Sequence, residues 1–159
     1  VRGSITQVSQ MRIGFVIIAL LTFNGCDYTE RFAGGKLNGE VLPTPNDWSF
    51  SDSTMLVQLE TNPKNPYSVN IWGVGIDSNY YVAAGQASEA AWAIHIESNH
   101  AVRLRIGNSI YLLEADRTTD MNELLNVTTA FEKKYGSSQE WVNTAWVYRL
   151  APRTDSNDN

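Results

Sequence analysis

The sequence predicts an α+β fold in which six short strands form an antiparallel β-barrel and two or three short helices are added late in the chain. Short runs of alternating apolar and polar residues recur at close spacing, and Gly, Pro, Asn or Asp bounds each of them. Apolar residues at helical spacing appear only in the second half of the chain. A length of 159 residues with 43% hydrophobic composition indicates one domain with a sizeable core.

We expect one strand over residues 67–76, YSVNIWGVGI, and place it at the centre of the barrel. Residues alternate across a strand, so this one has an apolar face and a second face that carries Ser68, Asn70 and Trp72. Ser, Asn and Trp on one face suit either a partly polar core or a ligand. This face is therefore the first candidate wall of a binding site.

Turn residues separate the remaining strands from one another. Asp77-Ser78-Asn79 and Gly107-Asn108 supply tight turns of the kind found in hairpins, because Asp, Asn and Gly tolerate left-handed backbone. The other strands are expected at 54–60, 80–84, 100–106, 109–115 and 144–151.

Two helices are indicated by capping residues and apolar stripes. Ser88 is the expected N-cap of a short helix that ends near residue 98 and buries Trp92. The second helix is expected to begin at Asp120, with Glu123 in its first turn, and to end at Gly136. Trp141 is expected to begin or pack a further helical turn.

Residues 11–26, MRIGFVIIALLTFNGC, have the form of a secretory signal. Arg12 precedes an apolar run that is shorter than the about 20 residues of a membrane span. The run and the small residue before Cys26 resemble the bacterial lipoprotein signal, in which the cysteine is lipidated and becomes the mature N-terminus. We expect translation to start at Met11, with residues 1–10 upstream of it. The alternative is a buried helix that ends in a free thiol.

The lipoprotein resemblance implies an anchored protein of the bacterial cell envelope. Asp27 directly after the cysteine resembles an inner-membrane retention signal, so the expected location is the inner membrane, facing the periplasm. Residues 27–46 are rich in Gly and Pro and are expected to form a tether. The barrel domain is expected at 47–152, followed by a flexible tail at 153–159. Between residues 27 and 50, the apolar residues that could dock on the domain are Leu37, Val41, Trp48 and Phe50.

Composition and motifs exclude several classes of function. The net charge of −5 argues against nucleic-acid binding, which depends on clustered Lys and Arg. The single cysteine excludes an internal disulfide and a zinc cluster of cysteines. His95 and His100 are the two histidines, and their spacing matches no metal motif. No nucleophile motif or phosphate loop is present, so no catalytic residue is assigned.

The order of elements from about residue 54 to 150 resembles a known superfamily. It comprises the strand at 67–72, a hairpin, YYVAAG at 80–85, a helix tryptophan at Trp92, NHAVRLRI at 99–106, and a helix that begins at Thr119-Asp120 and ends in KKYG at 133–136. This order is similar to the split-barrel flavin-binding superfamily, which contains the pyridoxamine-phosphate oxidases and, as the nearer match, the deazaflavin-dependent nitroreductases. The resemblance implies a six-stranded antiparallel split β-barrel.

The resemblance also implies FMN or a deazaflavin bound between the two subunits of a homodimer. It places Lys64 at the phosphate, the backbone of Ala84 and Gly85 at the ring, and Trp92 beside the site. Together with the strand face, the candidate cofactor-binding residues are Lys64, Ser68, Asn70, Trp72, Ala84, Gly85 and Trp92. One hypothesis is therefore a membrane-anchored flavin- or deazaflavin-dependent oxidoreductase.

A second hypothesis follows from the loop around Lys64, which has one basic residue where the nitroreductase-like group has several. Each missing cation removes a charge-assisted contact of about 1.5–3 kcal/mol. The alternative is a non-catalytic envelope module that binds no cofactor and uses the barrel for a small ligand or another protein. Under this hypothesis Lys64 is a solvated surface lysine, and the two tryptophans serve packing.

Overall fold

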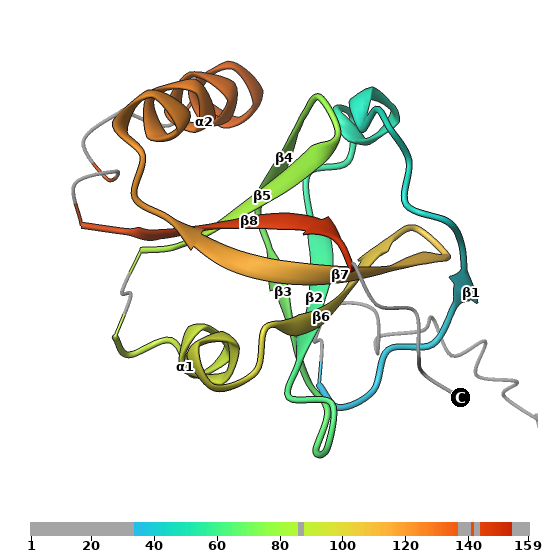
Figure 1. The fold of residues 1–159 in the computed structure, drawn as a ribbon. Coiled ribbons are helices and arrows are strands. Elements are labelled where there is room, and N and C mark those ends of the chain that lie inside the picture. Colours follow the sequence, from blue (N-terminus) through green and yellow to red (C-terminus); the bar gives the residue numbers. More distant parts are fainter. Residues whose placement is uncertain (1–33, 86–87, 137–140, 142–143, 154–159) are drawn as a thin grey trace, which may run out of the picture.

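The computed structural model describes residues 34–85, 88–136, 141 and 144–153, which form a curled antiparallel sheet with two α-helices (Figure 1). The α+β class and the antiparallel sheet are thus confirmed. The strands of the sheet run in the order β3, β2, β6, β7, β8, β5, β4, and a short β1 pairs in parallel with β7. Their bounds are β1 Glu40–Val41, β2 Val57–Thr61, β3 Tyr67–Ile71, β4 Gly73–Ile76, β5 Asn79–Ala84, β6 Ala101–Ile106, β7 Ser109–Thr118 and β8 Trp146–Pro152.

The prediction of a single central strand at 67–76 is wrong. Trp72 divides the run into β3, which pairs with β2, and β4, which pairs with β5. These two strands stand at opposite ends of the sheet order, so one residue joins the two edges. The division adds one strand to the predicted six, and the short β1, which was not predicted, adds another. We call the place where the two edges meet at Trp72 the seam.

The turns of two hairpins lie at the residues predicted from the sequence. Asp77, with φ 53°, turns β4 into β5, and Gly107, with φ 61°, turns β6 into β7. Strand β7 continues three residues beyond the predicted end at Ala115, because β8 pairs along it as far as Thr118. Strand pairing thus sets an end that the local sequence did not indicate.

Helix α2 (Met121–Tyr135) has the predicted caps. The Asp120 carboxylate accepts a hydrogen bond from Glu123 N at 2.8 Å, and Gly136 ends the helix with φ 67°. Helix α1 (Ala91–Ser98) begins three residues after Ser88, and its N-cap Ala90 makes no side-chain cap bond, so the predicted cap is wrong. A 3₁₀ helix, η2 (Ser49–Ser51), precedes β2.

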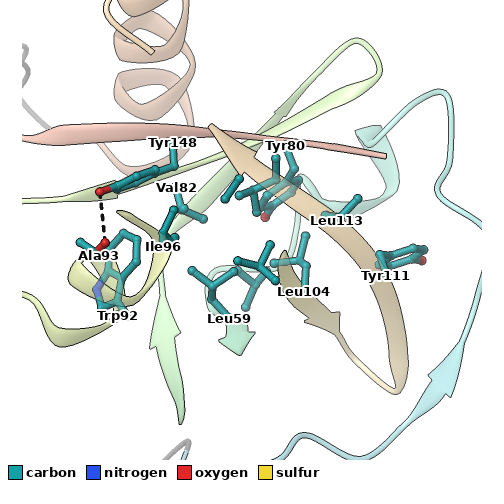
Figure 2. Packing of buried hydrophobic residues seen from close by; sticks show 14 of the residues in the cluster. Leu59, Tyr80, Val82, Trp92, Ala93, Ile96, Leu104, Tyr111, Leu113 and Tyr148 are labelled. Atoms are coloured by element: carbon teal, nitrogen blue, oxygen red, sulfur yellow. Dashed lines mark hydrogen bonds between the residues drawn. The ribbon is translucent and has the colours of Figure 1, made fainter. Parts of the chain in front are cut away.

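The sheet buries side chains on both faces. Along β5, Tyr80 and Val82 enter the main core together with Trp92 and Ile96 of α1 (Figure 2). Tyr81, on the opposite face of β5, joins a smaller cluster of α2 side chains. Figure 1 accordingly shows α1 and α2 on different sides of the sheet. The main core contains Trp48, Val57, Leu59, Tyr80, Val82, Ala84, Trp92, Ala93, Ile96, Val102, Leu104, Ile106, Tyr111, Leu113, Ala115, Tyr148 and Leu150.

The segment before the barrel lies partly on the sheet. Of the four apolar residues expected to dock, Leu37 and Trp48 are buried, whereas Val41 and Phe50 are about half exposed. Residues 1–33, with the predicted signal and Cys26, lie outside the described residues, as do residues 154–159. Neither described helix combines the length and apolar character that crossing a bilayer requires.

Candidate functional site

A cleft of about 480 Å³ lies at the seam. Its volume falls within the about 300–1,000 Å³ that is usual for sites of small molecules and cofactors. No charged side chain is among the described residues that line it, and Asn70 is the polar one. The lining residues are Leu56, Asn70, Ile71, Trp72, Ala83, Gly85, Phe131 and Trp141.

Trp72 forms one wall of the cleft and is held by an aromatic stack. Its ring lies on the ring of Tyr135 from α2, with centroids 4.5 Å apart and an interplanar angle of 4°. Trp72 is still 48% exposed, so part of its surface faces solvent and the cleft. A flat aromatic surface that is fixed before binding suits a planar ligand, because little side-chain entropy is lost on stacking.

The C-terminal turn of α2 is tied to the seam by hydrogen bonds to Gly73. The Tyr135 hydroxyl accepts from Gly73 N at 3.0 Å and donates to Gly73 O at 2.9 Å. Lys134 Nζ donates to Gly73 O at 2.9 Å and to Ser51 O at 3.0 Å. Burial lowers the pKa of Lys134 and raises that of Tyr135. These contacts fix the aromatic wall against the backbone where β4 begins.

Two further residues that line the cleft are also aromatic. Phe131 of α2 contacts Trp141 edge to face, with centroids 5.1 Å apart, and lies 5.5 Å from Tyr135. The N-terminal part of α2 is held to the sheet by Glu123, which accepts from the Tyr81 hydroxyl at 2.8 Å and pairs with Arg149 at 3.3 Å. Burial and the Glu123 carboxylate raise the pKa of Tyr81 to about 12. Helix α2 is thus fastened at both ends, and Phe131 in its C-terminal half lines the cleft.

The structure brings three predicted site residues together, because Asn70, Trp72 and Gly85 all line the cleft. Lys64 is exposed in the loop between β2 and β3 and is not among the lining residues. Ser68 is buried beside Glu60, and its hydroxyl makes no hydrogen bond to a described residue. The remaining two predicted residues, Ala84 and Trp92, are buried in the main core.

Sequence reasoning missed the contribution of α2 to the cleft. Phe131 and Tyr135 belong to the apolar stripe of the second predicted helix, but a stripe does not indicate which part of the sheet the helix covers. Their spacing of four residues before the Gly136 cap was the available signal. Among residues 34–85, 88–136, 141 and 144–153 no cluster of three or more His, Cys, Asp or Glu side chains could hold a metal ion.

A second hollow of about 690 Å³ adjoins the cleft and shares Leu56 and Asn70 with it. This hollow is more polar and contains Arg105, whose Nε donates to Gly107 O at 2.9 Å. Its lining residues are Thr54, Leu56, Gln58, Asn70, Arg105, Gly107 and Asn108. The surface thus changes from apolar and aromatic to polar and basic on either side of Asn70.

No family model and no curated protein matches the sequence. Solved structures do. The heme storage protein HutZ from Vibrio cholerae is similar over 67% of this chain and 87% of its own, with a TM-score of 0.56 and 17% identity. A conserved hypothetical protein from Mycobacterium tuberculosis matches 66% of this chain and 77% of its own, with a TM-score of 0.55 and 16% identity. An FAD-binding protein from Mesorhizobium loti matches 65% of this chain and 82% of its own, with a TM-score of 0.50 and 12% identity.

At these identities the similarity shows the fold. The structural neighbours are split-barrel proteins of the pyridoxamine-phosphate-oxidase-like kind, so the expected fold is confirmed at that level. The strand count differs from the predicted six, because Trp72 divides one strand into β3 and β4 and because β1 was not predicted. What each neighbour binds is a property of that neighbour.

Proposed function

We propose that this protein is a flavin- or deazaflavin-dependent oxidoreductase that binds the cofactor ring in the cleft at the seam. The observation that carries the proposal is a cleft of about 480 Å³ that no described charged side chain lines and that is lined by the aromatic residues Trp72, Phe131 and Trp141. A split-barrel fold shared with an FAD-binding protein supports the same class of ligand. A bound flavin or deazaflavin would supply the hydride chemistry, which agrees with the lack of a recognisable acid–base motif.

The residues present fit a planar ring with a polar edge. Trp72 offers a fixed aromatic surface, and Phe131 offers a second one. Asn70 has both a donor and an acceptor for heteroatoms at the edge of a ring. At Gly85 a Cβ would have no heavy atom within 4 Å, so the backbone there is open to a ligand. The aromatic residues and the Asn70 amide would orient the ring, and Ile71 and Ala83 add apolar surface to the cleft.

The substitution Trp72→Ala is expected to weaken flavin binding by about tenfold or more, since stacking on an aromatic side chain contributes about 1–3 kcal/mol. The measurement is a titration of the full chain in mild detergent with FMN and with a deazaflavin, followed by fluorescence and by the shift in Tm.

Phe50→Ala is the matched control, because Phe50 is also an aromatic residue, about half exposed and packed on another ring, but lies outside the cleft. It is expected to leave both affinities unchanged. Equal losses in the two variants would contradict a ring site at Trp72, and no saturable binding by the wild-type protein would reject the proposed function.

The uncharged cleft favours one alternative, a module that binds an apolar planar ligand without catalysis. One neighbour of similar fold is a heme storage protein. One observation distinguishes the two functions. An oxidoreductase must reduce and reoxidise its bound cofactor, whereas a binding module does not. Stoichiometric flavin binding with reduction by a nicotinamide donor supports the enzyme, whereas binding of heme in place of both flavins supports the module.

The proposed envelope location and homodimer rest on different features. Lipidation at Cys26 would anchor the domain in the inner membrane, facing the periplasm, and Cys26→Ala is expected to move the protein from the membrane to the soluble fraction. A second copy of the chain would cover the apolar residues Met55, Leu56 and Trp72, which are 53%, 57% and 48% exposed and of which Leu56 and Trp72 line the cleft. Sedimentation equilibrium of the detergent-solubilised chain tests the dimer, and a monomer at all concentrations would reject it.

A further inference from the structure

We propose that the end of the domain around the β2–β3 loop is a membrane-contact surface for a bilayer that contains anionic lipids. We call it the basic end and define it by Lys36, Lys64, Arg103 and Arg153. The inference rests on the lipid anchor proposed at Cys26, because it states which side of the anchored domain faces the bilayer. The cleft at the seam lies at the other end of the β2–β3 hairpin, so the two surfaces are separate.

A hollow of about 300 Å³ lies at the basic end. Three basic residues, Lys36, Arg103 and Arg153, line it together with one carboxylate, that of Glu60. Arg103 donates to both oxygens of this carboxylate, at 2.9 and 2.8 Å, so the two charges compensate each other. Since two further basic side chains line the same hollow, its charge is positive.

The remaining basic residues are held at this end by their surroundings. Arg153 follows the last strand, and its guanidinium donates to Leu113 O at 3.0 Å and to Val102 O at 2.9 Å. Lys64 is exposed in the loop between β2 and β3, directly after Pro63, which lines the hollow. The basic side chains thus come from both ends of the domain sequence and from one hairpin loop, and the fold brings them together.

The basic end contrasts with the charge of the whole chain. The chain has a net charge of −5, yet four of the nine Lys and Arg in residues 34–85, 88–136, 141 and 144–153 lie at this end. Salt screens charges beyond about 8 Å, so an anionic bilayer acts mainly on the residues that touch it. A Lys or Arg close to such a surface gains about 1 kcal/mol, or about fivefold in binding. A bilayer with anionic lipids therefore favours contact through this end over contact through the acidic remainder.

The chain leaves the domain at the same place. Leu37 is 5% exposed, and its backbone N–H donates to the Glu60 carboxylate, which fixes the chain directly after Lys36. In Figure 1 the first described residues, in blue, accordingly lie beside the lower ends of β2 and β3. Cys26 is eleven residues before Leu37, a stretch that spans at most about 40 Å when fully extended. A lipid anchor at Cys26 would therefore hold the basic end near the bilayer.

The first test measures which lysines the bilayer covers. The full chain is added to vesicles of phosphatidylcholine alone or with about one third phosphatidylglycerol, and an amine-reactive label is read out at each lysine by mass spectrometry. Labelling of Lys36 and Lys64 is expected to be about fivefold slower on the anionic vesicles than on the neutral ones. Lys133 is the internal control, because it is also exposed but belongs to α2 and does not line this hollow, and its labelling should not change.

The second test uses substitutions and the ratio of binding to the two vesicle types. The ratio cancels the contribution of the apolar run at 13–23, which is the same on both kinds of vesicle. Lys64→Gln is expected to lower the preference for anionic vesicles by about fivefold, whereas the matched variant Lys133→Gln keeps the wild-type preference. Higher salt should weaken the preference, because the contact is between charges.

Each outcome has a defined meaning. Unchanged labelling of Lys36 and Lys64 on anionic vesicles, or equal protection of Lys133, overturns the proposal. An equal preference in Lys64→Gln and in the wild type also overturns it. No flavin is present in either test, so a failure of flavin binding leaves the basic end standing. If Cys26 carries no lipid in cells, the anchor is rejected, while the vesicle results still decide whether this end binds anionic lipid.

Discussion

Trp48→Ala is expected to destabilise the protein by about 3–5 kcal/mol, the usual cost of removing a large aromatic side chain from a core. Trp48 is fully buried and contacts Tyr80 and Tyr111 edge to face, with centroids 5.1 and 4.9 Å away. Its indole Nε1 donates to Ser78 O at 3.1 Å, in the turn between β4 and β5. The measurement is the free energy of unfolding in urea, followed by circular dichroism.

Gly75 shows how closely the chain is packed around this residue. A Cβ at Gly75 would lie 2.2 Å from Trp48 Cβ, so β4 approaches the tryptophan at a distance that only glycine allows. Trp48 therefore positions β4, whose first residue Gly73 holds the seam. Loss of the indole is expected to loosen the strand that supports the cleft as well as the core.

Phe50→Ala provides the comparison. Phe50 stacks on Trp48 at 5.9 Å but is 51% exposed, so its removal is expected to cost less than about 1 kcal/mol. If Trp48→Ala does not fold, Trp48→Phe keeps most of the volume and should show a smaller, measurable loss. Equal stability of Trp48→Ala and wild type would contradict the packing.

Local signals in the sequence were sufficient for the hairpins and for α2. Asp120 and Gly136 set the ends of that helix through cap geometry, and Asp77 and Gly107 adopt the positive φ angles that their turns require. Each of these features depends on residues that are close in sequence. Prediction is reliable there because the interactions form within one turn.

The break at Trp72 could not be seen in the same way. The run YSVNIWGVGI keeps an extended pattern on both sides of Trp72, and the change of partner from β2 to β5 depends on strands that come before and after it. Long-range pairing with β8 also determines where β7 ends. A separate pairing with β7 makes Glu40–Val41 a strand within a segment rich in Gly and Pro. Periodicity indicates that a strand exists but carries no information on its neighbours.

The same limit explains the partial success with the site. The polar face with Asn70 and Trp72 was correctly singled out as a cleft wall, because alternation along one strand is a local property. Phe131 and Trp141 reach the cleft only because α2 covers the face of β5 that carries Tyr81.

Glu60→Ala is expected to cost about 3–5 kcal/mol, because it leaves the partly buried Arg103 without its partner. Glu60 is 4% exposed, and its carboxylate accepts from Arg103 at 2.8 Å and from the backbone N–H of Leu37. The substitution therefore removes an ion pair and the bond that holds the segment before β1 to the sheet. Unfolding in urea measures the loss, and faster proteolysis near Leu37 would report release of that segment.

The double variant Glu60→Met with Arg103→Met separates charge from packing. Replacing a buried pair by apolar residues of similar volume is often neutral, so the double variant should be more stable than Glu60→Ala, apart from the unpaired Leu37 N–H. Asp116→Asn, which removes the half-exposed His100–Asp116 pair, is expected to change stability by less than about 1 kcal/mol. If the double variant lost as much free energy of unfolding as Glu60→Met and Arg103→Met lose in sum, Glu60 and Arg103 would contribute independently to stability.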